Sequence, residues 1–532
     1  MPGRIRHALG ELPMTLDATY ARNLEEIDEQ NWEYAHRLFQ CVAAASRPLR
    51  ADELAEFLAF EFKMGSTPTF LVDWREEDPA HTVLSTCTSL LAVVDVDGSP
   101  VIQFAHFSIK EYLISERLVK ADDVVSRFHV SMTLAHTIVA QACLGILLHL
   151  DENISKDSLR TFPLVHYAAE YWVNHARFNN VSSNILDGMK RLFDPRKHHL
   201  SVWLWMYNPI YPEDPFSDSE TDRPQKDSLT PLHHAAISGL CDVATFLIVK
   251  RCQDLRSLVV NYDATPLHLA SELGHADFAQ LLLEHGADTA AVDDTGFRPL
   301  CRASYEGHAE VARVILERGA EINTNLNDFN WTPLQLSLHN KHLEAARVLL
   351  AYGADTEVRD DGGLTPLHSA SASGQLDVAR MLLEHGADLE ARTPSGCTPL
   401  YFADEEIARF LIERGADAKA LNENGQTPLH HAAEQKCIGL PQVLLEHGVD
   451  VGALDADYAA PLNLVPSSTD SWDRKDLVEL LLEYSPPDSC TGKRGPSSFH
   501  KGQAPTGWSC NSAEAQSGGG SEDPNVLMVD DS

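Results

Sequence analysis

Residues 265–288 read TPLHLASELGHADFAQLLLEHGAD, and this stretch decides the fold because its pattern recurs along the chain. The string Thr-Pro-Leu begins at Thr230, Thr265, Thr332, Thr365, Thr398 and Thr427, with degenerate copies at Arg298 and Ala460. The successive spacings are 35, 33, 34, 33, 33, 29 and 33 residues. A period of about 33 residues indicates stacked units that cannot bury their apolar faces alone. We therefore predict a mostly α fold arranged as a solenoid.

One unit can be interpreted residue by residue. Thr265 is placed to cap a helix, and Pro266 takes the first helical position, where its missing N–H costs nothing. Gly274 ends this short helix. A second helix carries apolar residues from Phe278 onward at i, i+3 and i+4, and Gly286 is placed as its C′ residue. The polar, turn-rich segment that follows suits an extended finger.

The pattern TPLHxA…GH…LLLEHGAD resembles the ankyrin repeat over residues 230–485. The resemblance implies about eight repeats with β-hairpin fingers, whose finger tips and inner helices carry protein recognition. We assign residues 229–485 to this array.

The segment HLASELGH places His268, Glu272 and His275 at i, i+4 and i+7, a spacing that also suits a metal site. Other units repeat the histidine at the position of His268, but the position of Glu272 holds Ile237, Tyr305, His339 and Ala372 in other units, so no ligand set recurs. Gly274 also interrupts the helix before His275. The resemblance implies that these histidines hydrogen-bond backbone groups. We expect no catalytic residue, no metal ligand and no cofactor.

The array departs from its own pattern in three places. Residues 250–264 lack the Gly-Ala-Asp ending, which makes the first unit a junction. The unit that begins at Thr398 lacks four residues, close to one helical turn, so we expect a shortened first helix and an altered groove. The last unit carries Pro466 and an insertion, which predicts a frayed cap.

Repeat alignment places a set of variable residues on the finger tips and inner helices. These candidate protein-binding residues are Phe297, Arg302, Tyr305, Trp331, Leu336, His339, Leu364, Phe402, Gln426, His431 and Glu434. Large apolar residues at solvent-facing positions indicate a contact surface. The equal alternative is that Trp331 and Phe297 only pack against neighbouring fingers. Residues 230–485 hold 39 acidic side chains and 18 lysines and arginines, which favours a partner with a basic or mixed face.

The composition excludes several classes of protein. A formal net charge of -36 repels a phosphate backbone, so direct nucleic-acid binding is not expected. The ten cysteines form no CxxC pair, which fits a reducing, intracellular setting in the cytoplasm or nucleus. The N-terminus lacks the apolar core of a secretory signal. The apolar window 133–150 is interrupted by His136, Gln141 and His149, so we predict a buried helix and no membrane span.

The first 120 residues have a different organisation. Segments 12–27 and 32–60 show helical periodicity that is broken at Arg47-Pro48-Leu49. Two short apolar runs about Asp97-Gly98 predict a β-hairpin, and a helix is expected from Ser108. Three helices followed by a hairpin are the order of a winged-helix unit. We expect it to pack against protein and not against DNA, because Lys110 is flanked by Glu111 and Glu116.

Three blocks in this part carry a second resemblance: LPMTLDATYARNLEEI, SRPLRADELAEFLA and AHFSIKEYLIS. They look like the winged-helix segment, also labelled after GPI inositol deacylase, that follows the NACHT ATPase core of fungal NLR-like proteins. FPLVHYAAEYWVNHAR (162–177) resembles the helical connector to their ankyrin arrays. Such proteins hold nucleotide phosphates with a G-x-x-x-x-G-K-[ST] loop, but the Gly-Lys pair here, Gly492-Lys493, is followed by Arg494. No G-x-S-x-G hydrolase motif is present either.

These observations predict the following domains. They are a winged-helix-like domain (1–120), a helical connector (121–207), an acidic linker (208–228), the ankyrin array (229–485) and a disordered tail (486–532). The tail ends with Val526-Leu527-Met528-Val529 between acidic residues, a composition shared with activation segments, although a solvated terminus is the simpler interpretation.

We expect a non-enzymatic adaptor whose array binds a protein partner. One form is a transcription coregulator that binds a transcription factor. Another is a truncated NLR-like signalling or incompatibility protein. The alternative from a different class is an enzyme, either a cryptic NTPase or a metal-dependent hydrolase that uses the scattered histidines.

Overall fold

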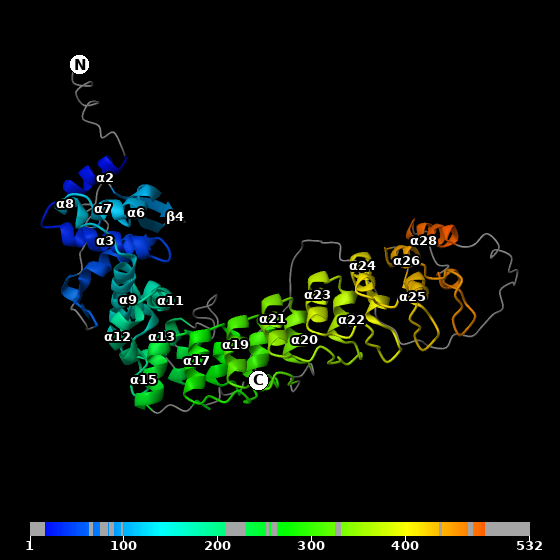
Figure 1. The fold of residues 1–532 in the computed structure, drawn as a ribbon. Coiled ribbons are helices and arrows are strands. Elements are labelled where there is room, and N and C mark those ends of the chain that lie inside the picture. Colours follow the sequence, from blue (N-terminus) through cyan, green and yellow to red (C-terminus); the bar gives the residue numbers. More distant parts are fainter. Residues whose placement is uncertain are drawn as a thin grey trace, which may run out of the picture. The chain divides into compact units, whose positions relative to one another are not determined.

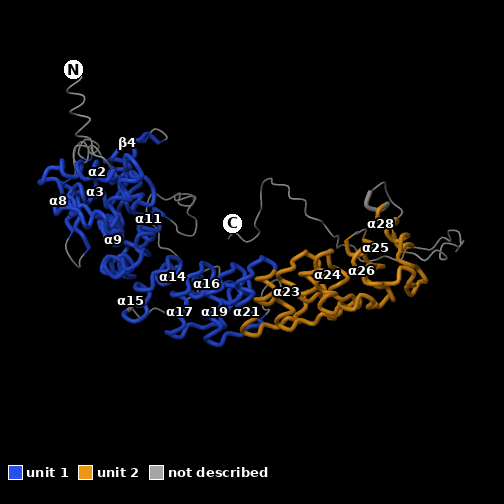
Figure 2. The backbone as a smooth tube through the Cα atoms, turned by 45° about the horizontal axis from the view of Figure 1, so that its top comes forward, with its two compact units in different colours: residues 1–329, 339–349 blue, residues 330–338, 350–532 orange. Residues whose placement is uncertain are grey.

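The chain is mostly helical, and its contacts divide it into two compact units (Figure 2). The computed structural model describes residues 16–62, 67–74, 83, 90–96, 99–207, 229–251, 255–256, 263–324, 331–435, 439–465 and 472–484. Unit 1 comprises Met1–Phe329 and His339–Leu349, and unit 2 comprises Asn330–Leu338 and Leu350–Ser532. The predicted acidic linker, the disordered tail and Pro466 lie outside the described residues.

Unit 1 begins with helices and a small antiparallel sheet. The elements are α2 (Leu16–Glu25), α3 (Trp32–Ala44), β1 (Leu49–Arg50), α4 (Ala51–Glu56), η1 (Phe57–Ala59), β2 (Phe60–Glu61), β3 (Thr69–Phe70), η2 (Val72–Trp74), β4 (Leu91–Val96) and β5 (Ser99–Phe104). The sheet order is β1-β5-β4, and the pairing of Val96 with Ser99 confirms the predicted hairpin. The break after α3 falls where Pro48 predicts it. The winged-helix assignment itself stays a prediction.

The rest of the N-terminal part is a helical layer built around one long helix. Its elements are α6 (Phe107–Leu113), α7 (Glu116–Val119), α8 (Asp123–Ser126), α9 (Met132–His149), α10 (Lys156–Leu159), α11 (Val165–Ala176), η3 (Ser182–Asn184), α12 (Leu186–Leu192) and α13 (His199–Met206). Helix α9 is long and apolar enough to span a bilayer, with a mean hydropathy of 1.5, but 61% of it is buried. It packs against α3, α11 and α12 (Figure 1). A Cβ at Gly145 would lie 2.7 Å from the Phe60 ring, so this close packing requires glycine.

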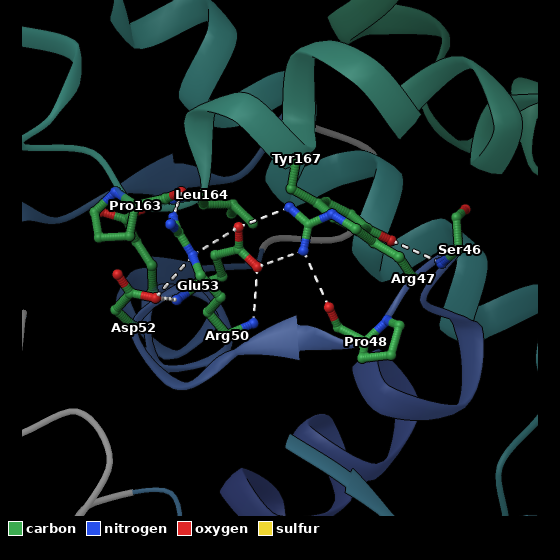
Figure 3. A network of polar contacts seen from close by, with 10 residues as sticks. Ser46, Arg47, Pro48, Arg50, Asp52, Glu53, Pro163, Leu164 and Tyr167 are labelled. Atoms are coloured by element: carbon green, nitrogen blue, oxygen red, sulfur yellow. Dashed lines mark hydrogen bonds and ion pairs between the residues drawn. The ribbon is translucent and has the colours of Figure 1, made fainter. Parts of the chain in front are cut away.

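A buried polar network joins this sheet region to α11 (Figure 3). The Glu53 side chain is 1% exposed and accepts hydrogen bonds from both terminal nitrogens of Arg47, at 2.9 and 2.8 Å. The same carboxylate accepts the Arg50 backbone N–H at 2.8 Å. The Tyr167 hydroxyl accepts the Ser46 N–H at 3.0 Å, and the Arg47 guanidinium lies 5.1 Å from the Tyr167 ring. Residues of the predicted segments 1–120 and 121–207 therefore share one core.

Paired helices follow in both units. In unit 1 they are α14 (Pro231–Ile237), α15 (Cys241–Arg251), α16 (Pro266–Glu272), α17 (Ala276–Glu284), α18 (Pro299–Tyr305), α19 (Ala309–Glu317) and most of α21 (Leu343–Ala351). Unit 2 holds most of α20 (Pro333–His339), then α22 (Pro366–Ala372), α23 (Leu376–Glu384), η4 (Pro399–Phe402), α24 (Glu405–Glu413), α25 (Pro428–Gln435), α26 (Gly439–Glu446), α27 (Pro461–Leu464) and α28 (Trp472–Glu483).

A histidine that recurs in several units connects the first helix of its unit to the next finger. The Nδ1 atom of His268 accepts from the Thr265 N–H (3.1 Å) and hydroxyl (2.9 Å), and its Nε2–H donates to the Phe297 carbonyl at 3.1 Å. His368 makes the same contacts with Thr365 and with the Cys397 carbonyl. Burial lowers the pKa of both histidines, so they stay neutral and keep both roles. The predicted structural role of His268 is confirmed.

The unit that begins at Thr398, which lacks four residues, has a shorter first helix than the units before it. Element η4 is a single 3₁₀ turn where other units have a first helix, as predicted. Asp404 then caps α24 by accepting the Ile407 N–H at 2.9 Å. In unit 1, the His308 ring fills the space beside Gly274, whereas an Asp404 oxygen occupies the corresponding space beside Gly374. An aspartate thus replaces the histidine of the usual Gly-His turn.

Five cysteines lie in the described residues, and none of the five forms a disulfide bond. Cys41, Cys143, Cys301 and Cys397 are buried, and Cys241 is half-buried. Burial raises the pKa of Cys41 to about 12 and that of Cys143 well above its usual value. These thiols act as small apolar side chains in the core.

Candidate protein-binding surface

Two of the candidate binding residues are not on the surface. Phe297 is 2% exposed and Leu336 is 1% exposed, so the expectation that they face solvent is wrong. The Phe297 N–H donates to the Asp293 side chain at 2.9 Å, which turns the ring inward against Tyr305 and Arg302. The alternative interpretation, packing against neighbours, therefore applies to Phe297.

In unit 1, a buried carboxylate fixes the position of Arg302. Asp293 has a fully buried side chain and accepts the Arg302 Nε–H at 2.8 Å. Arg302 also donates to the Thr295 hydroxyl at 3.0 Å, and its guanidinium lies 4.8 Å from the Phe297 ring. The Arg302 side chain keeps 19% exposure. A cation held on several sides loses little conformational entropy when it binds a ligand.

The residues around Arg302 give the surface a mixed character. Burial raises the pKa of Glu272, and the neighbouring Arg302 opposes this shift. Leu273 is 44% exposed. Tyr305 is half-buried, and its carbonyl accepts from Asn340 at 2.8 Å.

In unit 2, four aromatic rings gather at the shortened unit. The Phe402 ring lies 5.9 Å from His368 and 5.7 Å from His431, and Tyr401 lies 6.0 Å from His431. The Tyr401 hydroxyl is 2.6 Å from the carbonyl oxygens of Ala420 and Gln426, and these contacts fix the position of the ring. Burial lowers the pKa of His431, so this imidazole stays neutral and apolar in character.

The remaining candidates lie at or near the surface. His339 and Glu434 are exposed, while Trp331, Leu364, Phe402, Gln426 and His431 are half-buried. Within unit 1 the structure brings Phe297, Arg302 and Tyr305 together, and within unit 2 it brings Phe402 and His431 together.

The candidate list from repeat alignment omits a set of exposed apolar residues in the fingers. They occupy the position eight residues after the end of each second helix: Leu421 is 52% exposed and Leu454 is 59% exposed. Arg359 and Arg392 hold this position in the preceding units, and we call these four residues of unit 2 the finger row. Val292 takes the position in unit 1 and is 40% exposed. The signal was present in the sequence, as leucine and valine in a polar turn segment.

Hydrogen bonds hold consecutive fingers of unit 2 in register. Arg359 Nη1 donates to the carbonyls of Gly363 and Arg392, at 2.8 and 2.7 Å. Arg392 Nη1 donates to the carbonyls of Gly396 and Leu421, at 3.1 and 2.7 Å. The two arginine side chains therefore stabilise the stacking of the fingers. Leu421 and Leu454, which hold the same position in the next two units, expose apolar surface.

Each member of the finger row has an exposed acidic residue within four positions of it in the chain. These acidic residues are Asp361, Asp388, Glu423 and Asp457. Two exposed leucines with carboxylates near them in the chain are complementary to a segment that carries apolar and basic side chains.

A cavity of about 480 Å³ lies in unit 1 between η3 and the starts of α15 and α17, and sequence analysis did not predict it. Internal contacts occupy its polar groups: Ser182 donates to Asp242 at 2.5 Å, and Arg177 donates to His275 Nδ1 at 2.9 Å. Burial raises the pKa of Cys241 to about 11, so its thiol is not a nucleophile at neutral pH. The described residues also contain no group of three or more His, Cys, Asp or Glu placed to hold a metal ion.

The array matches a known family. The family model described as ankyrin repeats (3 copies) matches residues 232–326, 323–393 and 390–455. The C-terminal half of the chain therefore contains ankyrin repeats.

Curated relatives cover parts of the chain. The azaphilone pigments biosynthesis cluster protein L of Monascus ruber is 29% identical over 293 residues, which are 53% of this chain and 61% of that protein. The human palmitoyltransferase ZDHHC13 is 39% identical over 75 residues, 14% of this chain and 12% of the enzyme. The chain thus spans less than two thirds of each of these relatives.

Proposed function

We propose that the ankyrin repeats make this chain a non-enzymatic adaptor that binds an apolar and basic segment of a partner protein. The observation that carries the proposal is the finger row, where Leu421 and Leu454 expose 52% and 59% of their surface at equivalent positions. Apolar side chains repeated at one position of a solenoid form a regular contact surface. The match to ankyrin repeats supports a protein partner.

The test is affinity purification with the tagged full chain, comparing two double variants. The double variant Leu421→Lys, Leu454→Lys removes the apolar contacts and adds cations that repel the basic residues of the partner. We therefore expect recovery of the partner to fall at least about tenfold. The control, Val119→Lys with Val249→Lys, makes the same change at residues that are 54% and 52% exposed outside the fingers. Equal recovery with both double variants contradicts the proposed surface.

A second pair of substitutions tests the inner-helix candidates. Tyr305→Ala and Trp331→Ala remove half-buried rings from positions that the sequence places on the binding side. If every partner is retained by the double variant, recognition does not use these rings.

We propose the transcription coregulator as the first form of this adaptor, in the cytoplasm or nucleus. The acidic composition and the acidic-apolar sequence after Ser521 support it. Imaging of the tagged chain, with identification of its partners, tests it. A transcription factor among the partners is the expected result, and exclusion from the nucleus contradicts it.

The truncated NLR-like protein is the second form. The antiparallel order β1-β5-β4 beside α3 and α4 supports a winged-helix-like module that docks protein, and we propose eight repeats after it. The presence of a phosphate-binding loop in the genomic sequence upstream favours this form over the first.

We propose no enzymatic activity. The match to a palmitoyltransferase covers 12% of that enzyme, which gives no support for acyl transfer here. Stoichiometric ATP or zinc in the purified chain contradicts the adaptor proposal in favour of an NTPase or a metal-dependent hydrolase.

A further inference from the structure

The first helices of three consecutive repeats in unit 1 place their last residues in one row. These residues are Ile237 of α14, Glu272 of α16 and Tyr305 of α18. The backbone carbonyl of each accepts a hydrogen bond of 2.8–2.9 Å from a histidine or asparagine side chain of the following repeat. Neighbouring helices of this layer pack against each other, at a typical axial separation of about 8–10 Å. A side chain that contacts Glu272 therefore also reaches Tyr305.

The Glu272 carboxylate is half-buried in this row without a cation beside it. Among the described residues, no group donates a hydrogen bond to this carboxylate, and no lysine, arginine or histidine lies within ion-pair distance of it. Burial raises the pKa of Glu272, because the charged form has lost part of its hydration. A carboxylate in this position gains more from a paired cation than a fully exposed carboxylate does.

Arg302 acts on Glu272 only from a distance, because its guanidinium is already paired. Its Nε–H donates to the fully buried carboxylate of Asp293 at 2.8 Å. Burial raises the pKa of Asp294 as it does that of Glu272, and the charge of Arg302 opposes both shifts. Three carboxylates thus surround one guanidinium, so negative charge remains in excess.

Tyr305 supplies an apolar face of fixed orientation next to this carboxylate. Its ring centroid lies 5.7 Å from that of Phe297, which is 2% exposed and belongs to the core. The Tyr305 ring is itself half-buried, so part of it faces solvent. The aliphatic stem of a lysine or arginine packs on apolar surface of this kind while its charged end stays with an anion.

We propose that this row receives a basic side chain of the partner protein, with its charged end paired with the Glu272 carboxylate and its stem against the Tyr305 ring. The excess of negative charge and the carboxylate without a paired cation favour a basic occupant over an acidic or a purely apolar one. The assignment of the occupant to a partner protein rests on the proposed function, whereas the preference for a cation does not. The site uses none of the finger-row residues.

The test uses n-butylammonium, which has the stem and the charged end of a lysine side chain, and n-butanol as its uncharged counterpart. Fluorotyrosine in place of Tyr305 in the full chain reports binding by fluorine NMR at constant ionic strength. We expect a saturable shift of the signal with n-butylammonium, and an affinity at least about fivefold higher than that for n-butanol. Equal affinities, or the absence of a saturable shift, overturn the proposal.

Two matched substitutions separate this site from the general negative charge of the chain. Glu272→Gln removes the proposed partner of the cation, and Glu284→Gln removes the same charge at a 48% exposed side chain at the end of α17. We expect Glu272→Gln to weaken n-butylammonium binding at least about fivefold, and Glu284→Gln to leave it within about twofold. Equal effects of the two substitutions show that the cation is held by overall charge and overturn the proposal.

The result can be distinguished from that of the finger-row test. If n-butylammonium does not bind but the double variant Leu421→Lys, Leu454→Lys still loses the partner, the cation site is wrong and the adaptor function stands. If n-butylammonium binds through Glu272 but the tagged chain recovers no partner, the cation site stands and the adaptor function is wrong.

Discussion

Glu53 is the buried charge on which the junction of β1, α4 and α11 depends. Its replacement by glutamine removes the charge and turns an amide toward the donors of Arg47 (Figure 3). We expect Glu53→Gln to lower the free energy of unfolding by about 3 kcal/mol, because a buried ion pair loses one partner. Urea unfolding of the full chain measures this change.

The control for Glu53→Gln is its neighbour Asp52. The Asp52 side chain is 44% exposed and pairs with Arg50 at 3.4 Å. Asp52→Asn is expected to change the free energy of unfolding by less than about 0.5 kcal/mol. Equal effects of the two substitutions contradict the role assigned to Glu53.

The histidine pair at α9 and α11 makes stability depend on pH. The fully buried His175 lies 2.8 Å from both the Tyr167 hydroxyl and His136 Nδ1, and burial lowers its pKa to about 3. Burial, with Lys110 nearby, also lowers the pKa of His136. Between pH 6.5 and about 3, unfolded His175 binds a proton that the folded residue does not. The free energy of unfolding therefore falls as pH falls, by about 1.4 kcal/mol per pH unit from this residue.

The measurement compares the unmodified chain with His175→Gln at pH 7, 6 and 5. The variant is expected to be less stable at pH 7 and to show a shallower loss of stability as pH falls. Parallel pH profiles would mean that His175 titrates in the folded chain as it does in the unfolded chain.

Sequence reasoning predicted the role of a residue where its neighbours in the chain determine it. His268 accepts the backbone N–H of Thr265, three positions away, and the resemblance to ankyrin repeats implied such a contact with the backbone. Phe297 was misplaced because its burial depends on Asp293 turning the finger inward. The finger row was missed because exposure at Leu421 depends on how fingers stack, which spacing alone does not reveal.

At the level of the elements, the finger glycines of unit 2 set how closely fingers stack. A Cβ at Gly396 would lie 2.9 Å from the Glu423 nitrogen, whereas a Cβ at Gly386 would meet nothing within 4 Å. Both residues have positive φ, at +82° and +89°. We expect Gly386→Ala to cost about 1–2 kcal/mol from backbone strain alone, and Gly396→Ala to cost at least about 1 kcal/mol more from overpacking.

Thermal or urea unfolding of the two alanine variants checks this difference. Gly386→Ala is the matched control, since it makes the same chemical change at a similar φ. If both variants lose the same stability, the contact between consecutive fingers is loose enough to accept a methyl group.

The elements themselves followed closely from the sequence. The predicted helix near Ser108 begins at Phe107, and the shortened first helix appears as η4. The short strands β2 and β3 were not predicted, because two-residue pairings carry no periodicity. Their partners are chosen by the tertiary packing around Phe60 and Phe70.

At the level of the whole molecule, the two units should respond separately to local damage. Contacts in a solenoid join only neighbouring repeats, so destabilisation stays near its origin. In hydrogen exchange of the full chain, Gly396→Ala is expected to speed exchange in α22–α26 and leave α9 and α11 unchanged. Glu53→Gln should do the reverse. Faster exchange in both units from either substitution contradicts this independence.

The buried cysteine thiols make it possible to measure the opening of each unit by the rate of their chemical modification. Only a thiolate reacts rapidly with an alkylating or oxidising agent, and burial keeps Cys41 and Cys143 protonated in unit 1. Cys397 is 5% exposed in unit 2. Reaction at each site must therefore wait for that unit to open, so the modification rate of each cysteine records how often its surroundings unfold.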